Sequence, residues 1–388
     1  MQLKFRELKE EGLKNNKRVD QFEGEGKSSA TRTFARELLQ NTLDARLDKE
    51  SPAKVNFKII ENHQSKLIND LREDLDLALT NSHSKDDESS KNLLLIEEFG
   101  TVGLNGPIGP RKDSNHANFW SNSGSRAGRG KQSKESTTLG GAGVGNIALF
   151  LVSGLKTILV YTVRNKVDSS ELCIDEEIPQ YVMGKIELRD SWLVDNKNDD
   201  SPGYTYEGFY SNQDQHGNTI PETDPQEINR FKDIFKLERK PNEIGTSFVI
   251  PDIHKEITKE FLIENILEEY FYSIYSGKLE INVDEVQINP KTLEAVCEEY
   301  LSTESNHPNA SKDFRQFQTD AETFIEEKFI QLKDDWKDNL ENNTLLEDSF
   351  IDQDSLKQAK RDFEEGEVVG IKVPINIFPH ELNEGKYI

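Results

Sequence analysis

The chain lacks long apolar runs and has few cysteines, and both features limit the classes of protein to which it can belong. No stretch of about 18 consecutive apolar residues occurs in the 388 residues, so an ordinary transmembrane helix is not expected. The first six residues, Met1 to Arg6, contain no apolar signal core. Cys173 and Cys297 are the two cysteines, and they read as reduced thiols far apart in the sequence. These features predict a cytoplasmic protein with no membrane partner.

The chain is also poor in positive charge and in histidines spaced as metal ligands. The seven histidines show no spacing typical of metal ligands, so a zinc site is not expected. There are 48 basic and 72 acidic residues, which gives a net charge of −24. Such a surface does not attract nucleic acid as a whole. The length of 388 residues suggests two or three folding units.

One segment departs from this acidic background. Between Arg111 and Lys134 the chain carries a single acid, Asp113, and six basic residues: Arg111, Lys112, Arg126, Arg129, Lys131 and Lys134. A glycine-rich stretch follows at once, so we interpret this basic segment as one that steers phosphates. The alternative is a solvated loop whose charge is incidental.

The most informative motif lies between Phe34 and Arg46. Glu37, Asn41 and Asp44 are spaced i, i+4 and i+7, which places them on one face of a helix. Mg²⁺ prefers oxygen ligands and keeps several waters, and a carboxylate near such a water can act as a general base. The alternative is a solvated polar face on an amphipathic helix, because short motifs often match by chance.

A second motif begins with the apolar run Leu93 to Ile96, which predicts a buried strand. The strand ends in Glu97 and Glu98, and Gly100 and Gly103 follow. A carboxylate at a strand end beside glycines can accept a hydrogen bond from a ligand while the bare backbone comes close.

Two further glycine motifs follow. Gly140 to Gly145 holds four glycines and leads into an apolar, helix-like stretch, a pattern typical of an anion site. It is not a P-loop, because no Gly-Lys-Ser or Gly-Lys-Thr follows. The last motif is Gly245-Thr246, which enters a strand that runs to Ile250.

In this order the four motifs resemble those of the GHKL ATPases, whose nucleotide site is the Bergerat fold; the superfamily includes DNA gyrase B, the ninety-kilodalton heat-shock chaperone, sensor histidine kinases and MutL. The resemblance implies that Glu37 is the general base and that Asn41 is the Mg²⁺ ligand. It places Glu98 where the family has the aspartate that binds the adenine amino group, with Thr246 in support. The other implied nucleotide contacts are Asp44, Ala45, Gly100, Gly103, Lys131, Gly141, Gly143, Val144, Gly145 and Asn146.

Two departures from the family pattern bear on turnover. Glu98 replaces the usual aspartate, and the extra methylene moves the carboxylate by roughly a bond length. Asn146 stands where close relatives often have lysine, so a phosphate-neutralising charge is lost. A finer resemblance over residues 115–165 is to bacterial MORC/MutL-like ATPases, which occur beside restriction-modification and anti-phage genes.

The resemblance implies an α+β fold. We expect a Bergerat-fold two-layer α/β sandwich with a mixed, mostly antiparallel sheet over residues 1–255. A helix-rich, partial transducer-like region of the S5 type is expected over 256–388. Within these limits the sequence predicts a helix over 256–276, a strand over 278–283 and charged helices near 310–340 and 353–365. Residues 1–27 are interpreted as a polar arm, 70–91 as a loop or insertion, and 195–225 as a loop or lobe.

Three functions follow as hypotheses. The first is a Mg²⁺-dependent module that binds ATP, hydrolyses it slowly and forms a nucleotide-dependent homodimer, as a clamp acting on DNA or on a nuclease or other defence-system subunit. The second is a non-hydrolysing subunit whose interactions are switched by nucleotide. The third, a sensor kinase, is disfavoured, because the first motif begins by residue 37 and leaves no room for a helical pair with a phosphoacceptor histidine.

Overall fold

The computed structural model of the protein describes residues 1–8, 13–16, 19, 27–106, 108, 119–120, 146–165, 178–194, 203–301, 329–330, 351–366 and 369–371. Contacts divide the chain into two compact units, Met1–Leu301 and Ser302–Ile388. Each unit is considered by itself. No helix within the described ranges is both long enough and apolar enough to cross a membrane.

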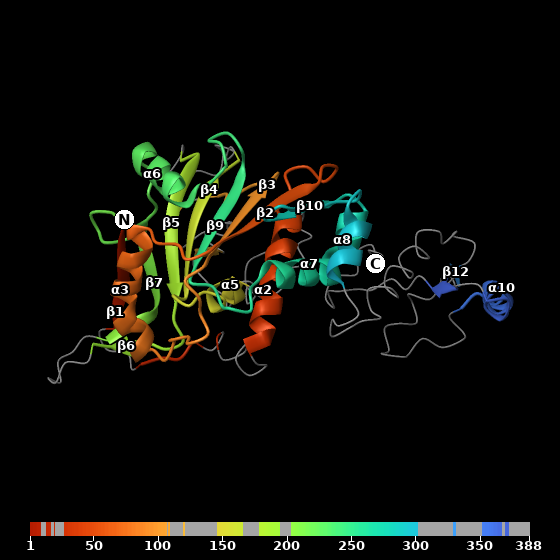
Figure 1. The fold of residues 1–388 in the computed structure, drawn as a ribbon, viewed down its shortest axis with the longest axis horizontal. Coiled ribbons are helices and arrows are strands. Elements are labelled where there is room, and N and C mark those ends of the chain that lie inside the picture. The colour runs from red at the N-terminus through yellow and green to blue at the C-terminus, as the bar shows by residue number, and fades with distance from the viewer. Residues whose placement is uncertain are drawn as a thin grey trace. The chain divides into compact units, whose positions relative to one another are not determined.

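The described residues of the first unit form an eleven-stranded sheet (Figure 1). Its main path runs β1-β7-β5-β4-β9-β3-β2-β10-β11, with β6 and β8 also paired to β7. Every neighbouring pair is antiparallel except β2 and β10, which are parallel. The strands are β1 (Gln2–Leu8), β2 (Ala53–Ile60), β3 (Leu93–Phe99), β4 (Thr157–Val163), β5 (Gln180–Glu187), β6 (Trp192–Leu193), β7 (Gly203–Gln213), β8 (Thr219–Ile220), β9 (Gly245–Pro251), β10 (Leu279–Val283) and β11 (Val286–Ile288).

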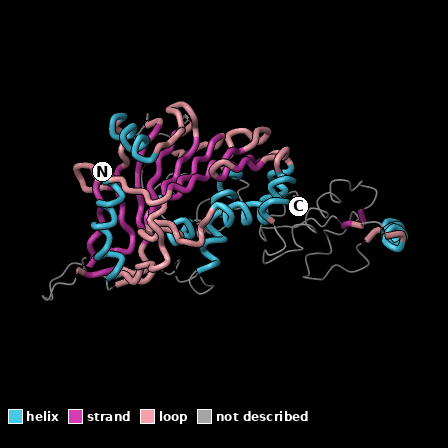
Figure 2. The backbone as a smooth tube through the Cα atoms, viewed as in Figure 1, coloured by secondary structure: helices cyan, strands magenta, loops and turns pink. Residues whose placement is uncertain are grey.

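Helices cover both faces of this sheet (Figure 2). On one face lie α2 (Lys27–Asp44), α5 (Asn146–Leu151), α7 (Lys259–Tyr275) and α8 (Leu293–Tyr300). On the other lie α3 (Lys66–Asn81) and α6 (Pro225–Phe235). The expected α+β class with a mixed, mostly antiparallel sheet is therefore confirmed, and α3 and α6 add helices on the face that a two-layer sandwich leaves open.

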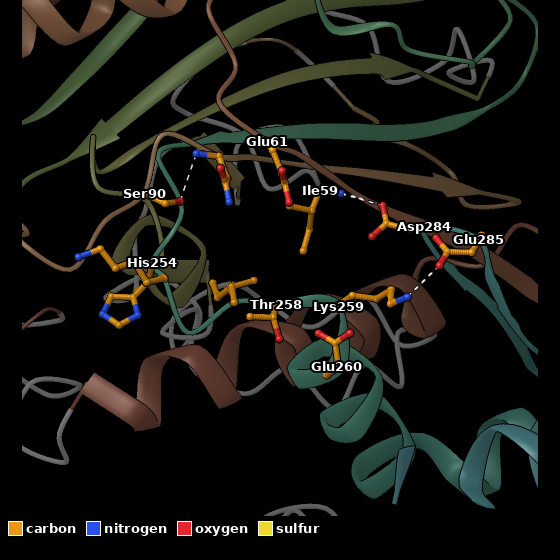
Figure 3. Close-up of a pocket in the computed structure, with 12 residues that line it drawn as sticks. Ile59, Glu61, Ser90, His254, Thr258, Lys259, Glu260, Asp284 and Glu285 are labelled. Carbon is orange, nitrogen blue, oxygen red and sulfur yellow. Dashed lines mark hydrogen bonds and ion pairs between the residues drawn. The ribbon is translucent and has the colours of Figure 1, made fainter. Parts of the chain in front are cut away.

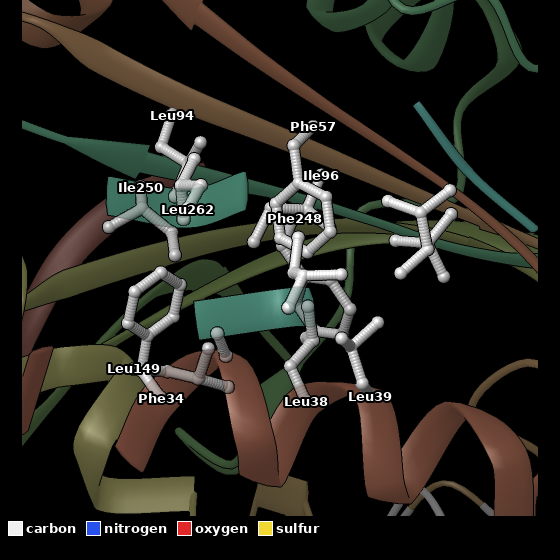
Figure 4. Close-up of a cluster of buried hydrophobic side chains, with 14 of the residues drawn as sticks. Phe34, Leu38, Leu39, Phe57, Leu94, Ile96, Leu149, Phe248, Ile250 and Leu262 are labelled. Atoms are coloured by element: carbon white, nitrogen blue, oxygen red, sulfur yellow. The ribbon is translucent and has the colours of Figure 1, made fainter. Parts of the chain in front are cut away.

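The α2 face carries the larger core. Phe34, Leu38 and Leu39 recur at helical spacing and are fully buried, so α2 packs one stripe of apolar side chains against the sheet. Figure 4 shows these side chains pointing from α2 toward the sheet, where Ile96 of β3 and Phe248 and Ile250 of β9 lie. Burial of this stripe leaves the other side of α2 available for polar residues.

Three polar segments form regular structure that the sequence reading did not predict. Residues 70–81 were expected to be a loop, yet they belong to α3, because its five buried residues recur at helical spacing beneath an acidic exposed face: Ile68, Leu71, Leu75, Ala78 and Leu79. Ser65 caps this helix by accepting a hydrogen bond from the Ile68 amide. Residues 203–213, also expected to be a loop, form β7, and the N-terminal β1 pairs with it.

The region after residue 255 contributes to the first unit. Ile281 of β10 pairs with Val55 of β2, so β10 extends the sheet. The phenol of Tyr270 on α7 donates a hydrogen bond to the carbonyl oxygen of Arg36 on α2. Contacts consequently divide the chain after Leu301 and not at residue 255. The assignment of 256–388 as a transducer-like region remains a prediction.

The described part of the second unit is small. β12 (Phe329–Ile330) and β13 (Gly370–Ile371) form a parallel pair. The helix predicted near 353–365 is confirmed as α10 (Gln353–Glu364), whose N-terminus is capped by Asp352. The helix predicted near 310–340 falls almost entirely outside the described residues.

Candidate functional site

The carboxyl group of Glu98 is buried between β3 and α2. Side chains alternate along β3, so Glu98 shares a face with Leu94 and Ile96, which pack in the core beneath α2. The hydroxyl of Thr42 on α2 donates a hydrogen bond to Glu98 Oε1. Burial raises the pKa of the Glu98 carboxyl to about 7, although Thr42 and Arg239 act in the opposite direction. This carboxyl group therefore changes its protonation state near neutral pH.

The neighbouring Glu97 points to the opposite face of the sheet. Its carboxylate accepts hydrogen bonds from the Ser247 hydroxyl at 3.0 Å and from the main-chain amides of Glu238 and Arg239 at 3.1 and 3.3 Å. These partners hold the loop before β9 against β3. Of the two adjacent acidic residues, only Glu98 faces α2.

The turn after β3 meets the C-terminal end of α2. The amide of Val102 donates to the carbonyl oxygen of Ala45 at 2.8 Å, and the amide of Leu47 donates to that of Gly100 at 2.9 Å. Gly103 has a φ of +69°, and a Cβ atom there would lie 2.5 Å from the Val163 carbonyl oxygen. Glycine is thus required where the turn passes close to β4. The first and second motifs are brought together at this point.

Two buried polar atoms in this turn have no hydrogen-bond partner within the described structure. They are Thr101 Oγ1 and Asn105 Oδ1. An unsatisfied buried polar group costs about 1–3 kcal/mol, so such atoms indicate a place where a polar ligand or water belongs. The Thr101 hydroxyl can donate or accept a hydrogen bond, and the Asn105 oxygen can accept one.

Thr246 lies beside Glu98 on the α2 face of the sheet. It has the same orientation along β9 as Phe248, which packs beneath α2. Thr162 pairs with Thr246 across β4 and β9, and the two hydroxyl oxygens are 3.5 Å apart. The Thr162 oxygen also accepts from the Leu104 amide at 3.0 Å. Glu98, Thr246 and Thr162 therefore form a row of polar side chains across three adjacent strands.

The polar residues Glu37, Asn41 and Asp44 lie along α2, with Asp44 nearest the turn after β3 and Glu37 farthest from it. Asn41 and Asp44 are exposed, and Glu37 is half-buried. Glu37 lies about 7–8 Å along the helix from Thr42, which contacts Glu98, given a rise of about 1.5 Å per residue. Burial raises the pKa of the Tyr270 phenol on α7, and the nearby charge of Glu37 adds to this effect. One helix thus carries Thr42, which contacts Glu98. Asn41, the predicted Mg²⁺ ligand, directly precedes Thr42, and Glu37, the predicted base, lies five residues before it.

Several predicted contacts lie outside the described residues: Lys131, Gly141, Gly143, Val144 and Gly145. Asn146 is the first residue of α5, which packs against α2. The predicted helical stretch after the glycines is therefore present over Asn146–Leu151.

The described residues do not form a metal-binding cluster by themselves. Within the described ranges, no group of three or more His, Cys, Asp or Glu side chains is placed to hold a metal ion. A Mg²⁺ ion at Asn41 would therefore need phosphate and water oxygens as its other ligands.

A cavity of about 430 Å³, between β2, β10 and the start of α7, is lined by Asp284, Lys259 and His254 (Figure 3). A second, of about 570 Å³, lies near Asn56 and Lys236. Neither is lined by a predicted site residue.

The chain resembles solved structures, but it matches no family model and no curated protein. A solved structure that is similar is the ATPase region of topoisomerase II from Saccharomyces cerevisiae, bound to dexrazoxane. The two are 11% identical with a TM-score of 0.34, over 71% of this chain and 53% of that one. The chain thus spans about half the length of that structure. The case for function comes from the geometry of the site itself.

Three residues of the site were missed in the sequence: Thr42, Thr162 and Arg239. Thr42 could have been found, because it continues the buried helical phase of Leu38 and Leu39 and is a polar residue within that stripe. Arg239 carried no local signal. It lies in a charged loop, and its partner Glu98 is 141 positions away in the sequence.

Proposed function

We propose that this chain is a GHKL-type module that binds ATP with Mg²⁺ and hydrolyses it slowly. The observation that supports it most directly is the meeting of Glu98, Thr246 and the Gly100–Gly103 turn at the end of α2. The same helix carries Glu37 and Asn41. A base-reading end and a phosphate end would then lie along one helix.

In this proposal Glu98 reads the base. Its ionised carboxylate accepts a hydrogen bond from the adenine amino group, and the Thr246 hydroxyl supports the contact. Both side chains face α2 from adjacent strands, and Thr101 and Asn105 offer polar atoms in the turn beside them. GTP presents a carbonyl oxygen at the amino position, which would leave two acceptors facing each other.

Glu37 acts on water in this proposal. Its carboxylate takes a proton from the water that attacks the γ-phosphate, a role suited to a half-buried carboxylate that stays hydrated on one side. Asn41, one turn further along α2, would hold Mg²⁺, which offsets the charge of the phosphate oxygens. The basic segment from Arg111 to Lys134 and the Gly140–Gly145 stretch would add phosphate contacts.

A wider role follows only from the finer sequence resemblance. The likeness of residues 115–165 to MORC/MutL-like ATPases supports a cytoplasmic, nucleotide-dependent homodimer in a defence system. DNA and a nuclease subunit are its candidate partners. Analytical ultracentrifugation with and without a non-hydrolysable ATP analogue tests the dimer, and a monomer under both conditions contradicts it.

A second function, a nucleotide-switched subunit without turnover, is favoured by one observation. Asn146, the first residue of α5, stands where close relatives in the resembled family often have lysine, so a charge that would neutralise phosphate is missing. Calorimetry of ATP binding beside a phosphate-release assay separates the two functions. Binding with release supports the ATPase, binding without release supports the switch, and no binding contradicts both.

A further inference from the structure

Arg239 is the largest fully buried side chain in the described part of the protein. It lies in the connection between α6 and β9, and 1% of its surface is exposed. A buried guanidinium group has five N–H donors, and each one left without an acceptor is costly. The hydrogen-bond partners of Arg239 therefore indicate its role.

Those partners belong to β3, β9 and the loop before β9. Arg239 Nη2 donates to the carbonyl oxygen of Glu98 and, at 2.9 Å, to that of Thr246. Nε donates to the Ser247 hydroxyl at 3.0 Å, and Nη1 donates to the Glu243 carbonyl oxygen at 3.1 Å. A single guanidinium group thus joins the main chains of the two residues whose side chains face α2.

The guanidinium group is itself held in place. Its carbon lies 4.4 Å from the centre of the Phe99 ring, a cation–π arrangement. The Ser247 hydroxyl that accepts from Nε donates in turn to Glu97, whose carboxylate also binds the Arg239 amide. Glu97 thereby supplies a negative charge on the same side of the sheet.

Arg239 links β3 and β9 just beyond the last pair of residues in their hydrogen-bonded ladder. The last paired residues of β3 and β9 are Glu97 and Ser247. Beyond them, Gly245 adopts a φ of +143°, and a Cβ atom there would lie 2.1 Å from the Glu98 carbonyl oxygen and 2.7 Å from Arg239 Nη1. The close approach therefore requires glycine. Between Glu98 and Thr246 the guanidinium group supplies the hydrogen bonds that the β3–β9 ladder no longer makes.

We propose that Arg239 is a positioning residue for base selection. It acts from the face opposite α2, and it fixes the distance between the Glu98 carboxylate and the Thr246 hydroxyl. An acceptor and a hydroxyl at fixed spacing select a purine nucleotide with an exocyclic amino group over one with a carbonyl there. This inference rests on the proposed function, because it concerns the same site.

The test compares three variants with the wild-type protein by calorimetry. Arg239→Met removes the guanidinium group, Ser247→Ala removes one of its anchors, and Arg230→Met on the exposed side of α6 is the matched control. The ligands are ATP, GTP and inorganic tripolyphosphate, which has no base. Circular dichroism melting curves show whether each variant is folded.

A positioning role predicts a loss of discrimination. Arg239→Met should lower ATP affinity about tenfold or more and bring the ATP-to-GTP affinity ratio close to one, the scale set by one misplaced buried hydrogen bond. Tripolyphosphate affinity should change less than about twofold, since the phosphate end lies along α2. Ser247→Ala should lower the ratio by about threefold, and Arg230→Met should change nothing.

Other results overturn the inference. Equal losses for all three ligands in a folded Arg239→Met protein show a structural role only. Where Arg239→Met does not fold, Ser247→Ala decides, and an unchanged ratio rejects the inference. Wild-type protein that binds no ATP, or binds GTP equally well, contradicts the proposed function and this inference together, whereas a wild-type preference that both variants retain contradicts this inference alone.

Discussion

The hydroxyl of Thr42 donates a hydrogen bond to the buried carboxyl group of Glu98, so the middle of the candidate site is a contact between helix α2 and the end of strand β3. The two residues are 56 positions apart in the chain. Because α2 also carries Glu37 and Asn41, this bond sets where the predicted catalytic groups lie relative to the strand that would read the base.

Substitution of the predicted general base tests the catalytic end. Glu37→Gln should lower ATP hydrolysis on the order of 10²-fold or more, because proton transfer contributes in the transition state. ATP affinity should change little, since the side chain hardly touches ground-state phosphates. Phosphate release and calorimetry measure the two quantities. Glu73→Gln on the exposed face of α3 is the matched control, and unchanged turnover in Glu37→Gln rejects the role of Glu37.

Removal of the predicted metal ligand separates Mg²⁺-dependent from metal-free binding. Asn41→Ala should weaken ATP binding in the presence of Mg²⁺ far more than in the presence of a chelator, because the amide oxygen would contact the ion. Titrations with and without Mg²⁺ measure the difference. Asn15→Ala, at an exposed asparagine outside α2, controls for general effects. If wild-type and Asn41→Ala proteins each bind ATP equally with and without Mg²⁺, Asn41 is not a ligand.

The base preference tests Glu98 directly. At pH 8 the wild-type protein should prefer ATP over GTP by roughly ten- to a hundred-fold, because a facing pair of acceptors leaves a buried group unsatisfied at about 1–3 kcal/mol. Glu98→Ala should lose affinity and preference together, and Glu98→Asp should keep the preference. Competition binding with both nucleotides provides the measurement. Equal binding of GTP and ATP by the wild-type protein means that Glu98 does not read the base.

The raised pKa of Glu98 predicts how stability varies with pH. Burial moves this pKa from 4.5 to about 7 in the folded state, so the folded protein keeps the proton to a higher pH than the unfolded chain. The free energy of unfolding should therefore fall as pH rises through this window, by up to about 3 kcal/mol from this group. Glu98→Gln removes the ionisation, and its stability relative to the wild type should rise from pH 4.5 to pH 8.

Urea unfolding at these pH values measures that difference. Thr42→Val provides a companion variant: loss of the hydroxyl should destabilise the protein more at pH 8 than at pH 4.5, because the ionised carboxylate loses its donor. Glu73→Gln should show no pH-dependent change relative to the wild type. A stability difference for Glu98→Gln that is constant across the pH range would contradict the buried ionisation.

Local patterns in the sequence were sufficient to predict several of the helices and strands. The spacing of Glu37, Asn41 and Asp44 predicted α2, and the apolar run from Leu93 to Ile96 predicted β3. These elements depend on residues a few positions apart, which the sequence displays directly. The same logic failed for α3, where acidic residues between the apolar positions obscured a clear helical period, and for β1 and β7, which are stabilised as strands by pairing with each other.

The sequence by itself determined that Glu37, Asn41 and Asp44 share a helix face and that an acidic pair ends a strand beside glycines. It left open which of Glu97 and Glu98 faces the helix, because alternation separates the two faces of a strand without saying what covers each. Only the tertiary structure decided this, by placing Thr42 against Glu98, and Ser247 with the loop before β9 against Glu97. It also brought in Arg239, because contacts between residues 141 positions apart depend on which strands pair, and no local pattern encodes that pairing.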